Sequence, residues 1–191
     1  MILFVAINLE TVIELNFIQK QLKNKLENLD LNLNWVNPQD FHITLAFIGK
    51  IKEENLDQIN LILKDIKFCK FKITLENLEL NKSNNIIWIK VKSEQLEELA
   101  YKIQENLHKF LKLDNHINFK RAFLPHATIL RIKNENLKEE EYKKIQNILD
   151  KINYNKPTLT INEFYLYESK RNIINHLKSS KYHKVNNFEL Y

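Results

Sequence analysis

Residues 42–45 read His-Ile-Thr-Leu and residues 126–129 read His-Ala-Thr-Ile, and each segment follows a turn that contains a proline, Pro38 or Pro125. On a β-strand, side chains two residues apart point to the same face, so the histidine and the threonine of each segment share one face. The apolar residues between and after them point toward the core. Two such strands brought together would form one pocket with two imidazoles and two hydroxyls.

The chain around these segments alternates between helical and strand patterns. Apolar residues at helical spacing predict helices over residues 12–29, 53–66, 94–111 and 135–152, with Thr11 and Ser93 capping the first and the third. Alternating patterns predict strands over residues 2–8, 41–48 (ended by Gly49), 71–80, 86–91, 126–132, 158–167 and 182–190. Hairpins mixed with helices indicate an α+β fold with antiparallel sheets. No linker divides residues 1–191, so we expect a single domain of two similar halves that face each other.

The composition excludes several classes of protein. A single glycine leaves no room for a Gly-rich phosphate loop or a dinucleotide-binding fingerprint. The net charge of +5 permits a polyanionic partner without requiring one. The lone Cys69 is expected to be a buried or half-buried small residue, and the absence of disulfides fits a reducing compartment. The apolar start of the chain is typical of a strand rather than a signal peptide, and no segment is long and apolar enough to span a bilayer. We therefore expect a cytoplasmic, monomeric protein with no membrane partner.

The two His-x-Thr segments favour hydrolysis of a cyclic phosphodiester. A neutral imidazole can take a proton from water and an imidazolium can protonate the leaving oxygen, because the unperturbed pKa of histidine, about 6.5, lies near working pH. The two hydroxyls can hold the non-bridging oxygens of the phosphate. This scheme needs no metal, and two histidines without a matched Asp, Glu or Cys make a poor zinc site.

Nearly the whole chain resembles the two-histidine (2H) phosphoesterase superfamily, and within it the bacterial and archaeal RNA 2′,3′-cyclic phosphodiesterases, historically called 2′-5′ RNA ligases. The resemblance rests on residues 1–9, 35–49, 87–89, 123–131 and 166–169 and on Tyr182. It implies a bilobal, LigT-like fold in which two antiparallel sheets face a central cleft, with helices on the outside. It also implies conversion of a terminal RNA 2′,3′-cyclic phosphate to a 2′-phosphate without a cofactor.

Residue roles follow from the resemblance position by position. His42 and His126 are the implied catalytic residues, and Thr44, Thr128, Arg131 and Phe47 are the implied substrate-binding residues. Arg131, five residues past His126, matches a phosphate-binding arginine, and a guanidinium is a natural anion clamp. Phe47, five residues past His42, matches an aromatic position that stacks on a base. Core packing is the other interpretation of Phe47, because strand alternation puts it out of phase with His42 unless the strand bulges or ends, and the sequence leaves both open.

Several alternatives stay open on the sequence. In the scheme that we favour, His126 activates water and His42 protonates the 3′ oxygen, but the sequence does not fix these roles. The same groups acting in reverse would give a 2′-5′ ligase. Other hypotheses are a different substrate, such as ADP-ribose 1″,2″-cyclic phosphate, a 2′-5′ oligonucleotide or another small cyclic nucleotide, and a nucleotide- or RNA-binding module without turnover. We expect surface or packing roles for the remaining histidines, His108, His116, His176 and His183.

Overall fold

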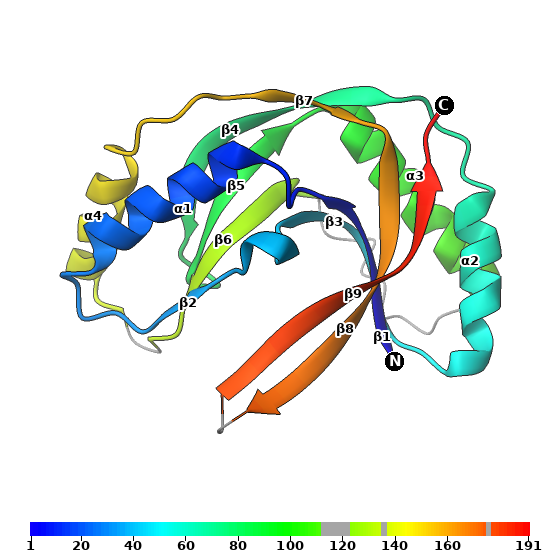
Figure 1. Ribbon diagram of the computed structural model, residues 1–191, viewed down its shortest axis with the longest axis horizontal. Helices are drawn as coiled ribbons and strands as arrows, with labels where there is room; N and C mark the ends of the chain where they lie inside the picture. The colour runs from blue at the N-terminus through cyan, green and yellow to red at the C-terminus, as the bar shows by residue number, and fades with distance from the viewer. Residues whose placement is uncertain (112–122, 135–136, 175–176) are drawn as a thin grey trace.

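The computed structural model describes residues 1–111, 123–134, 137–174 and 177–191. Within these ranges the chain forms nine strands and four α-helices (Figure 1). The strands are β1 (Ile2–Asn8), β2 (Leu33–Trp35), β3 (His42–Lys50), β4 (Phe71–Asn81), β5 (Ile86–Lys92), β6 (His126–Ile132), β7 (Thr158–Ile161), β8 (Glu163–Ile174) and β9 (Leu177–Glu189). The helices are α1 (Ile13–Leu26), α2 (Leu56–Lys64), α3 (Glu94–Leu111) and α4 (Glu139–Leu149), and short 3₁₀ turns cover Pro38–Asp40 and Glu53–Asn55.

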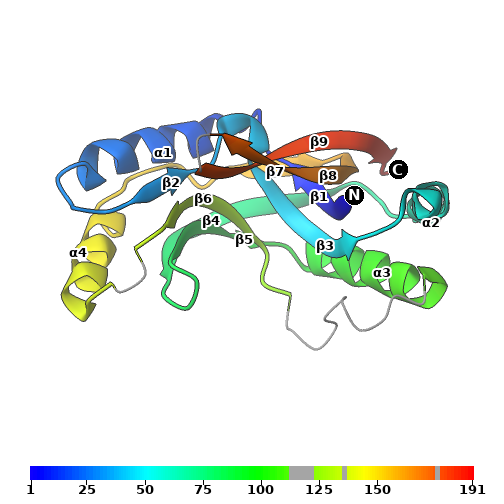
Figure 2. The same cartoon turned by 90° about the horizontal axis from the view of Figure 1, so that it is seen from below.

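All nine strands belong to one antiparallel sheet. Its order is β7-β4-β5-β6-β3-β1-β8-β9, and β2 also pairs with β6. The α+β class is as expected. The two expected sheets are, however, continuous with each other, because β3 and β6 are joined through a single residue pair, Ile43 opposite Ala127. The two halves of the sheet therefore meet at the centre of the molecule (Figure 2).

The helices lie in two pairs at opposite ends of the sheet, α1 with α4 and α2 with α3 (Figures 1 and 2). Their apolar stripes and one face of the sheet form the main core, in which Leu15, Ile18, Leu99 and Ile103 are fully buried. None of the helices in the described ranges is both long and apolar enough to cross a membrane. The opposite face of β3 and β6 is left uncovered by this core.

The C-terminal strands depart most from the expectation. The single strand predicted over residues 158–167 is split at Asn162, because β7 pairs with β4 at one edge of the sheet while β8 pairs with β1. One continuous strand cannot serve both neighbours. The last strand, predicted from Tyr182, begins at Leu177, and β8 and β9 form a long hairpin that projects from the molecule (Figure 1).

Smaller differences concern the ends of elements. The cap predicted at Thr11 is wrong: Val12 is the N-cap residue of α1 and offers no side-chain hydrogen bond. The cap at Ser93 is confirmed, since the Leu96 amide donates to its hydroxyl at 3.3 Å. Gly49 does not end β3. It lies inside the strand with φ of +86°, a conformation that favours glycine.

Candidate active site

The two His-x-Thr motifs lie on adjacent central strands, β3 and β6. Ile43 and Ala127, the middle residues of the motifs, are directly opposite each other and fully buried. Because antiparallel strands run in opposite directions, the residues that flank this pair are crossed. The flanking polar side chains are half-buried on the other face of the sheet. His42 is opposite Thr128, and Thr44 is opposite His126.

A β-bulge follows the first motif. Along the ladder with β1, the paired residues of β3 jump from Thr44 to Ala46, which leaves Leu45 without a partner there. Leu45 and Ala46 are both buried, and Phe47 is 58% exposed. The extra residue reverses the alternation, so Phe47 shares the face of His42.

A matching bulge follows the second motif. Along the ladder with β5, the paired residues of β6 jump from Thr128 to Leu130, which leaves Ile129 without a partner there. Ile129 and Leu130 are fully buried, whereas Arg131 is exposed. Arg131 therefore lies on the face of His126, in the position that Phe47 has on the first strand.

Two glutamines from helices support the bulges. Gln104 of α3 donates from Nε2 to the carbonyl oxygen of Leu45 at 2.6 Å. Gln19 of α1, which is 3% exposed, donates to the carbonyl oxygen of Ile129 at 3.4 Å and to that of Val36 at 2.7 Å. Bulged carbonyls leave the regular ladder and need another donor when they are buried. Gln104 supplies such a donor to Leu45, the third residue after His42. The carbonyl of Ile129, the third residue after His126, accepts from the Val36 amide at 3.1 Å, and Gln19 adds a second, longer bond to it.

Backbone carbonyls fix the tautomers of both motif histidines. His42 Nδ1 lies 2.6 Å from the carbonyl oxygen of Asp40, and His126 Nδ1 lies 2.7 Å from that of Leu124. A carbonyl oxygen can only accept, so Nδ1 of each ring carries the hydrogen and donates it. Nε2 is then the nitrogen of each ring that is left to take up or release a proton.

Aromatic rings pack against both imidazoles. His42 contacts Phe4 and Tyr182, with ring centroids 5.2 and 5.1 Å away, and His126 contacts Trp88 at 4.3 Å. The indole Nε1 of Trp88 is buried and has no hydrogen-bond partner among the residues that the structure describes. The rings restrict each imidazole to one orientation and remove water from its flank.

Burial is the main cause that lowers the pKa of both motif histidines. The pKa of His42 and that of His126 are lowered first by loss of hydration, and the hydrogen bonds to the carbonyls oppose this in part. The positive charge of Arg131 lowers both pKa values further, and His126 also lowers that of His42. Because the charge of Arg131 lowers the pKa of both imidazoles, its guanidinium group is near both of them and can bind an anion placed between them.

A hollow of about 350 Å³ opens beside the first motif and collects residues from several elements. It is lined by His42, Thr128 and Arg131 together with Asn34, Trp35, Val36, Asn37, Asp40, Lys133, Lys181 and Tyr182. The structure thus places three of the expected site residues in one hollow. The hydroxyls of Thr44 and Thr128 and the guanidinium of Arg131 make no hydrogen bond or ion pair with the described residues.

A second hollow, of about 660 Å³, lies on the other side of the motifs. His126 and Trp88 line it, with β4, β5 and the start of α3 supplying most of the remaining wall. Four carboxylates and two lysines face this hollow, namely Glu76, Glu79, Glu94, Glu97, Lys90 and Lys92. His42 thus lines one hollow and His126 the other.

The cysteine and the histidines outside the two motifs do not belong to the site as far as the structure describes them. Cys69 was expected to be buried or half-buried, and that is wrong, because the residue is exposed in the connection between α2 and β4. His108 lies exposed on α3 and His183 on β9. His116 and His176 lie outside the described residues.

Sequence reasoning did not find several residues that shape the site. The glutamines read as ordinary helix positions, and only their three-dimensional distance to the bulges reveals them. Lys181 belongs to β9, far along the chain from both motifs. Lys133 had a local signal, since it follows Arg131 by two residues, directly after the end of β6.

The family model described as LigT like Phosphoesterase matches the chain twice, over residues 12–88 and 89–174. The chain belongs to the LigT-like phosphoesterase family. Each match contains one His-x-Thr motif, so both halves of the site carry the family pattern.

Sequence relatives within this LigT-like family include two archaeal proteins. One from Archaeoglobus fulgidus, named RNA 2′,3′-cyclic phosphodiesterase, is 33% identical over 142 residues, 70% of this chain and 74% of the relative. One from Methanocaldococcus jannaschii with the same name is 31% identical over 137 residues, 69% of this chain and 71% of the relative.

Solved structures show the same LigT-like fold. A Thermus thermophilus protein superposes with a TM-score of 0.72 at 20% identity and covers 99% of this chain and 97% of its own. Escherichia coli LigT in complex with 3′-AMP superposes with a TM-score of 0.69, also at 20% identity, with 99% and 97% coverage. At this identity the likeness establishes the fold alone.

Proposed function

We propose that this protein is an RNA 2′,3′-cyclic phosphodiesterase that uses His42 and His126 as its acid–base pair. The observation that carries the proposal is the crossed pairing about Ile43 and Ala127, which gives each imidazole a threonine hydroxyl from the other strand as its neighbour. The names of the archaeal relatives favour the same substrate class.

In the proposed reaction, His126 takes a proton at Nε2 from a water molecule whose oxygen attacks phosphorus. The bond between phosphorus and the 3′ oxygen breaks, and His42 gives its Nε2 proton to that oxygen. The products are a 2′-phosphate and a 3′-hydroxyl. Both steps use the nitrogen that the carbonyl bonds of Asp40 and Leu124 leave available.

The remaining residues hold the phosphate. The hydroxyls of Thr44 and Thr128 donate to the non-bridging oxygens, and Arg131 neutralises the charge that builds on them. A bound anion between the imidazoles favours the protonated form of one of them, and so offsets the lowering of the histidine pKa values by burial. Phe47, on the same face, offers an exposed ring on which a base can stack.

The test is incubation of the purified protein, with EDTA present, with an oligonucleotide that ends in a 2′,3′-cyclic phosphate. The position of phosphate in the product is then identified by nuclear magnetic resonance. We expect a 2′-phosphate end. A 3′-phosphate product would reverse the assigned leaving group, and no turnover would contradict the proposed substrate. A parallel reaction with a 5′-hydroxyl oligonucleotide tests for the reverse, 2′-5′ joining reaction.

A further inference from the structure

We infer that the hollow beside His42 is the binding groove for the RNA strand on the 5′ side of the cyclic phosphate, and that the hollow beside His126 excludes this strand. The inference rests on the proposed function and adds a strand path to it. It is carried by the opposite charges of the two hollows.

The hollow beside His42 contains a succession of positive side chains. Arg131 and Lys133 line it from the end of β6 and Lys181 lines it from β9. None of the three lies within ion-pair distance of a carboxylate of the described residues. Unpaired cations from two distant parts of the chain converge on one hollow, which is the arrangement that binds a phosphodiester backbone.

The single carboxylate in this hollow does little to oppose that charge. Asp40 lines the same wall and is one negative charge against three positive ones; burial raises the pKa of its carboxyl group, and the charges of His183 and Lys181 oppose this rise. Tyr182 and Trp35 add ring surface beside the lysines. Aromatic surface next to cations is typical of grooves that bind single strands, because any base can stack there.

The hollow beside His126 has the opposite character. Among the described residues that line it, four carboxylates outnumber two lysines. Glu79 is paired with Lys90 at 2.8 Å and Glu76 with Lys156 at 3.7 Å, which leaves Glu94 and Glu97 against Lys92. A phosphodiester placed there would meet net negative charge. The two sides of the catalytic pair therefore differ in sign, and a strand leaving the cyclic phosphate is directed toward Lys133 and Lys181.

The experiment compares two substrates with the full-length protein. One is adenosine 2′,3′-cyclic phosphate, which has no phosphodiester on its 5′ side, and the other is a pentanucleotide with the same cyclic end. Lys133→Gln and Lys181→Gln are expected to lower the ratio of the pentanucleotide kcat/KM to the mononucleotide kcat/KM by about two- to five-fold each. Each should also reduce the salt slope of log kcat/KM for the pentanucleotide by about 0.7.

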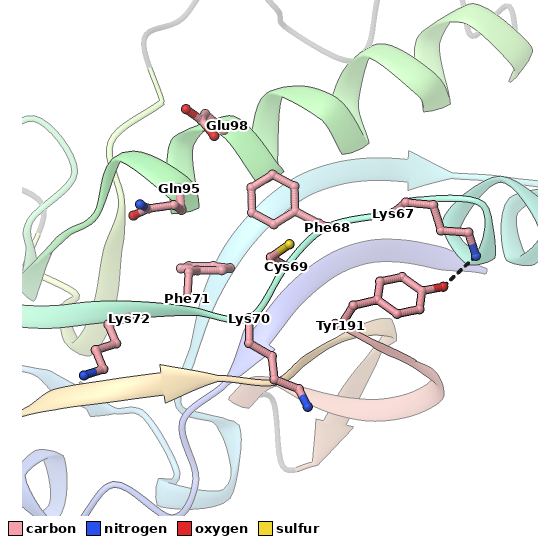
Figure 3. A pocket seen from close by; sticks show the side chains of 9 residues that line it. All are labelled: Lys67, Phe68, Cys69, Lys70, Phe71, Lys72, Gln95, Glu98 and Tyr191. Atoms are coloured by element: carbon pink, nitrogen blue, oxygen red, sulfur yellow. Dashed lines mark hydrogen bonds between the residues drawn. The ribbon is translucent and has the colours of Figure 1, made fainter.

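Two lysines serve as matched controls. Lys72 lines a separate pocket formed by the connection between α2 and β4, the start of β4, the start of α3 and Tyr191 (Figure 3). Lys72→Gln removes the same charge from a pocket that shares no residue with the groove, and should leave the ratio and the salt slope unchanged. Lys92→Gln removes a positive charge from the acidic hollow and should not lower the ratio either.

The outcomes separate the two proposals. Hydrolysis of neither substrate by the unmodified protein would refute the proposed function, and the groove with it. Hydrolysis of both, with an unchanged ratio in the Lys133→Gln, Lys181→Gln double variant, would refute the groove alone. A fall of the ratio in Lys92→Gln would place the strand in the other hollow. An equal loss for both substrates would mean that the lysines support the site rather than bind the strand.

Discussion

Ile43 on β3 lies directly opposite Ala127 on β6, and this one pair relates the two halves of the site. An approximate twofold relation through the pair exchanges the two motifs and also the two bulges that follow them. Phe47 and Arg131 therefore occupy corresponding positions, each five residues after a histidine. The two positions differ in chemistry, because Phe47 has an aromatic ring and Arg131 has a positive charge.

Replacing either motif histidine should remove most of the activity. We expect His42→Ala and His126→Ala each to lower kcat for the cyclic-phosphate oligonucleotide by about 10²–10⁴-fold, the usual scale for positioned proton transfer. The double variant should lose far less than the product of the two losses, because the imidazoles act as a unit. His108→Ala on α3 is the control and should keep full activity. Near-normal turnover by His126→Ala would refute the paired mechanism.

The threonine hydroxyls should contribute less than the histidines. Thr44→Val and Thr128→Val each remove one hydrogen bond to a charged group, worth about 1.5–3 kcal/mol, so kcat/KM should fall by about 10–100-fold. Thr44→Ser and Thr128→Ser retain the hydroxyl and should restore most of the loss. Near-normal kcat/KM in the valine variants would contradict the role assigned to the hydroxyls.

The glutamine supports predict a stability effect. Gln104→Leu leaves the carbonyl of Leu45 without its side-chain donor, which should lower the free energy of unfolding by about 1–3 kcal/mol in urea titrations. Activity should fall as well, because the bulge sets the face of Phe47. Gln146→Leu on α4 removes an exposed glutamine bonded to Asp150 and should change stability by less than about 0.5 kcal/mol. Similar costs for both variants would argue against a specific support of the bulge.

The pH dependence follows from the direction of the histidine pKa shifts. Both pKa values are lowered by burial, so the free enzyme loses its imidazolium below the ordinary histidine value of about 6.5. The rate constant kcat/KM should rise with pH through the lower apparent pKa and fall through the higher one, and its maximum should lie below about pH 6.5. The maximum of kcat should lie at higher pH, because a bound phosphate favours the protonated ring. A kcat/KM maximum above pH 7.5 would contradict these shifts.

The sequence predicted what depends on local pattern. Strand alternation alone put His42 beside Thr44 and His126 beside Thr128 on shared faces, and both strands are where they were expected. The face of Phe47 could not be derived, because the bulge at Leu45 arises where β3 and β6 separate and a helix supplies the missing donor. The short strand β2 was not predicted either, since its three residues gain order from pairing with β6.

The features that the sequence did not predict depend on contacts between segments far apart in the chain. Lys181 reaches the site only because the chain beyond Asn162 crosses to the other half of the sheet, and no local spacing encodes that crossing. The exposure of Cys69 shows that apolar neighbours in the sequence do not by themselves predict burial. An apolar neighbourhood in sequence suggested burial, but the segment between α2 and β4 runs along the surface.

The glutamine supports also bear on how the two halves depend on each other. α1 belongs to the first family match and supports a strand of the second, while α3 belongs to the second match and supports a strand of the first. The halves are therefore interlocked like the subunits of a domain-swapped dimer, with the exchange contained in one chain. Neither half, expressed alone, would retain the brace for its own histidine strand. A half-length chain could reproduce this geometry only as an intertwined homodimer.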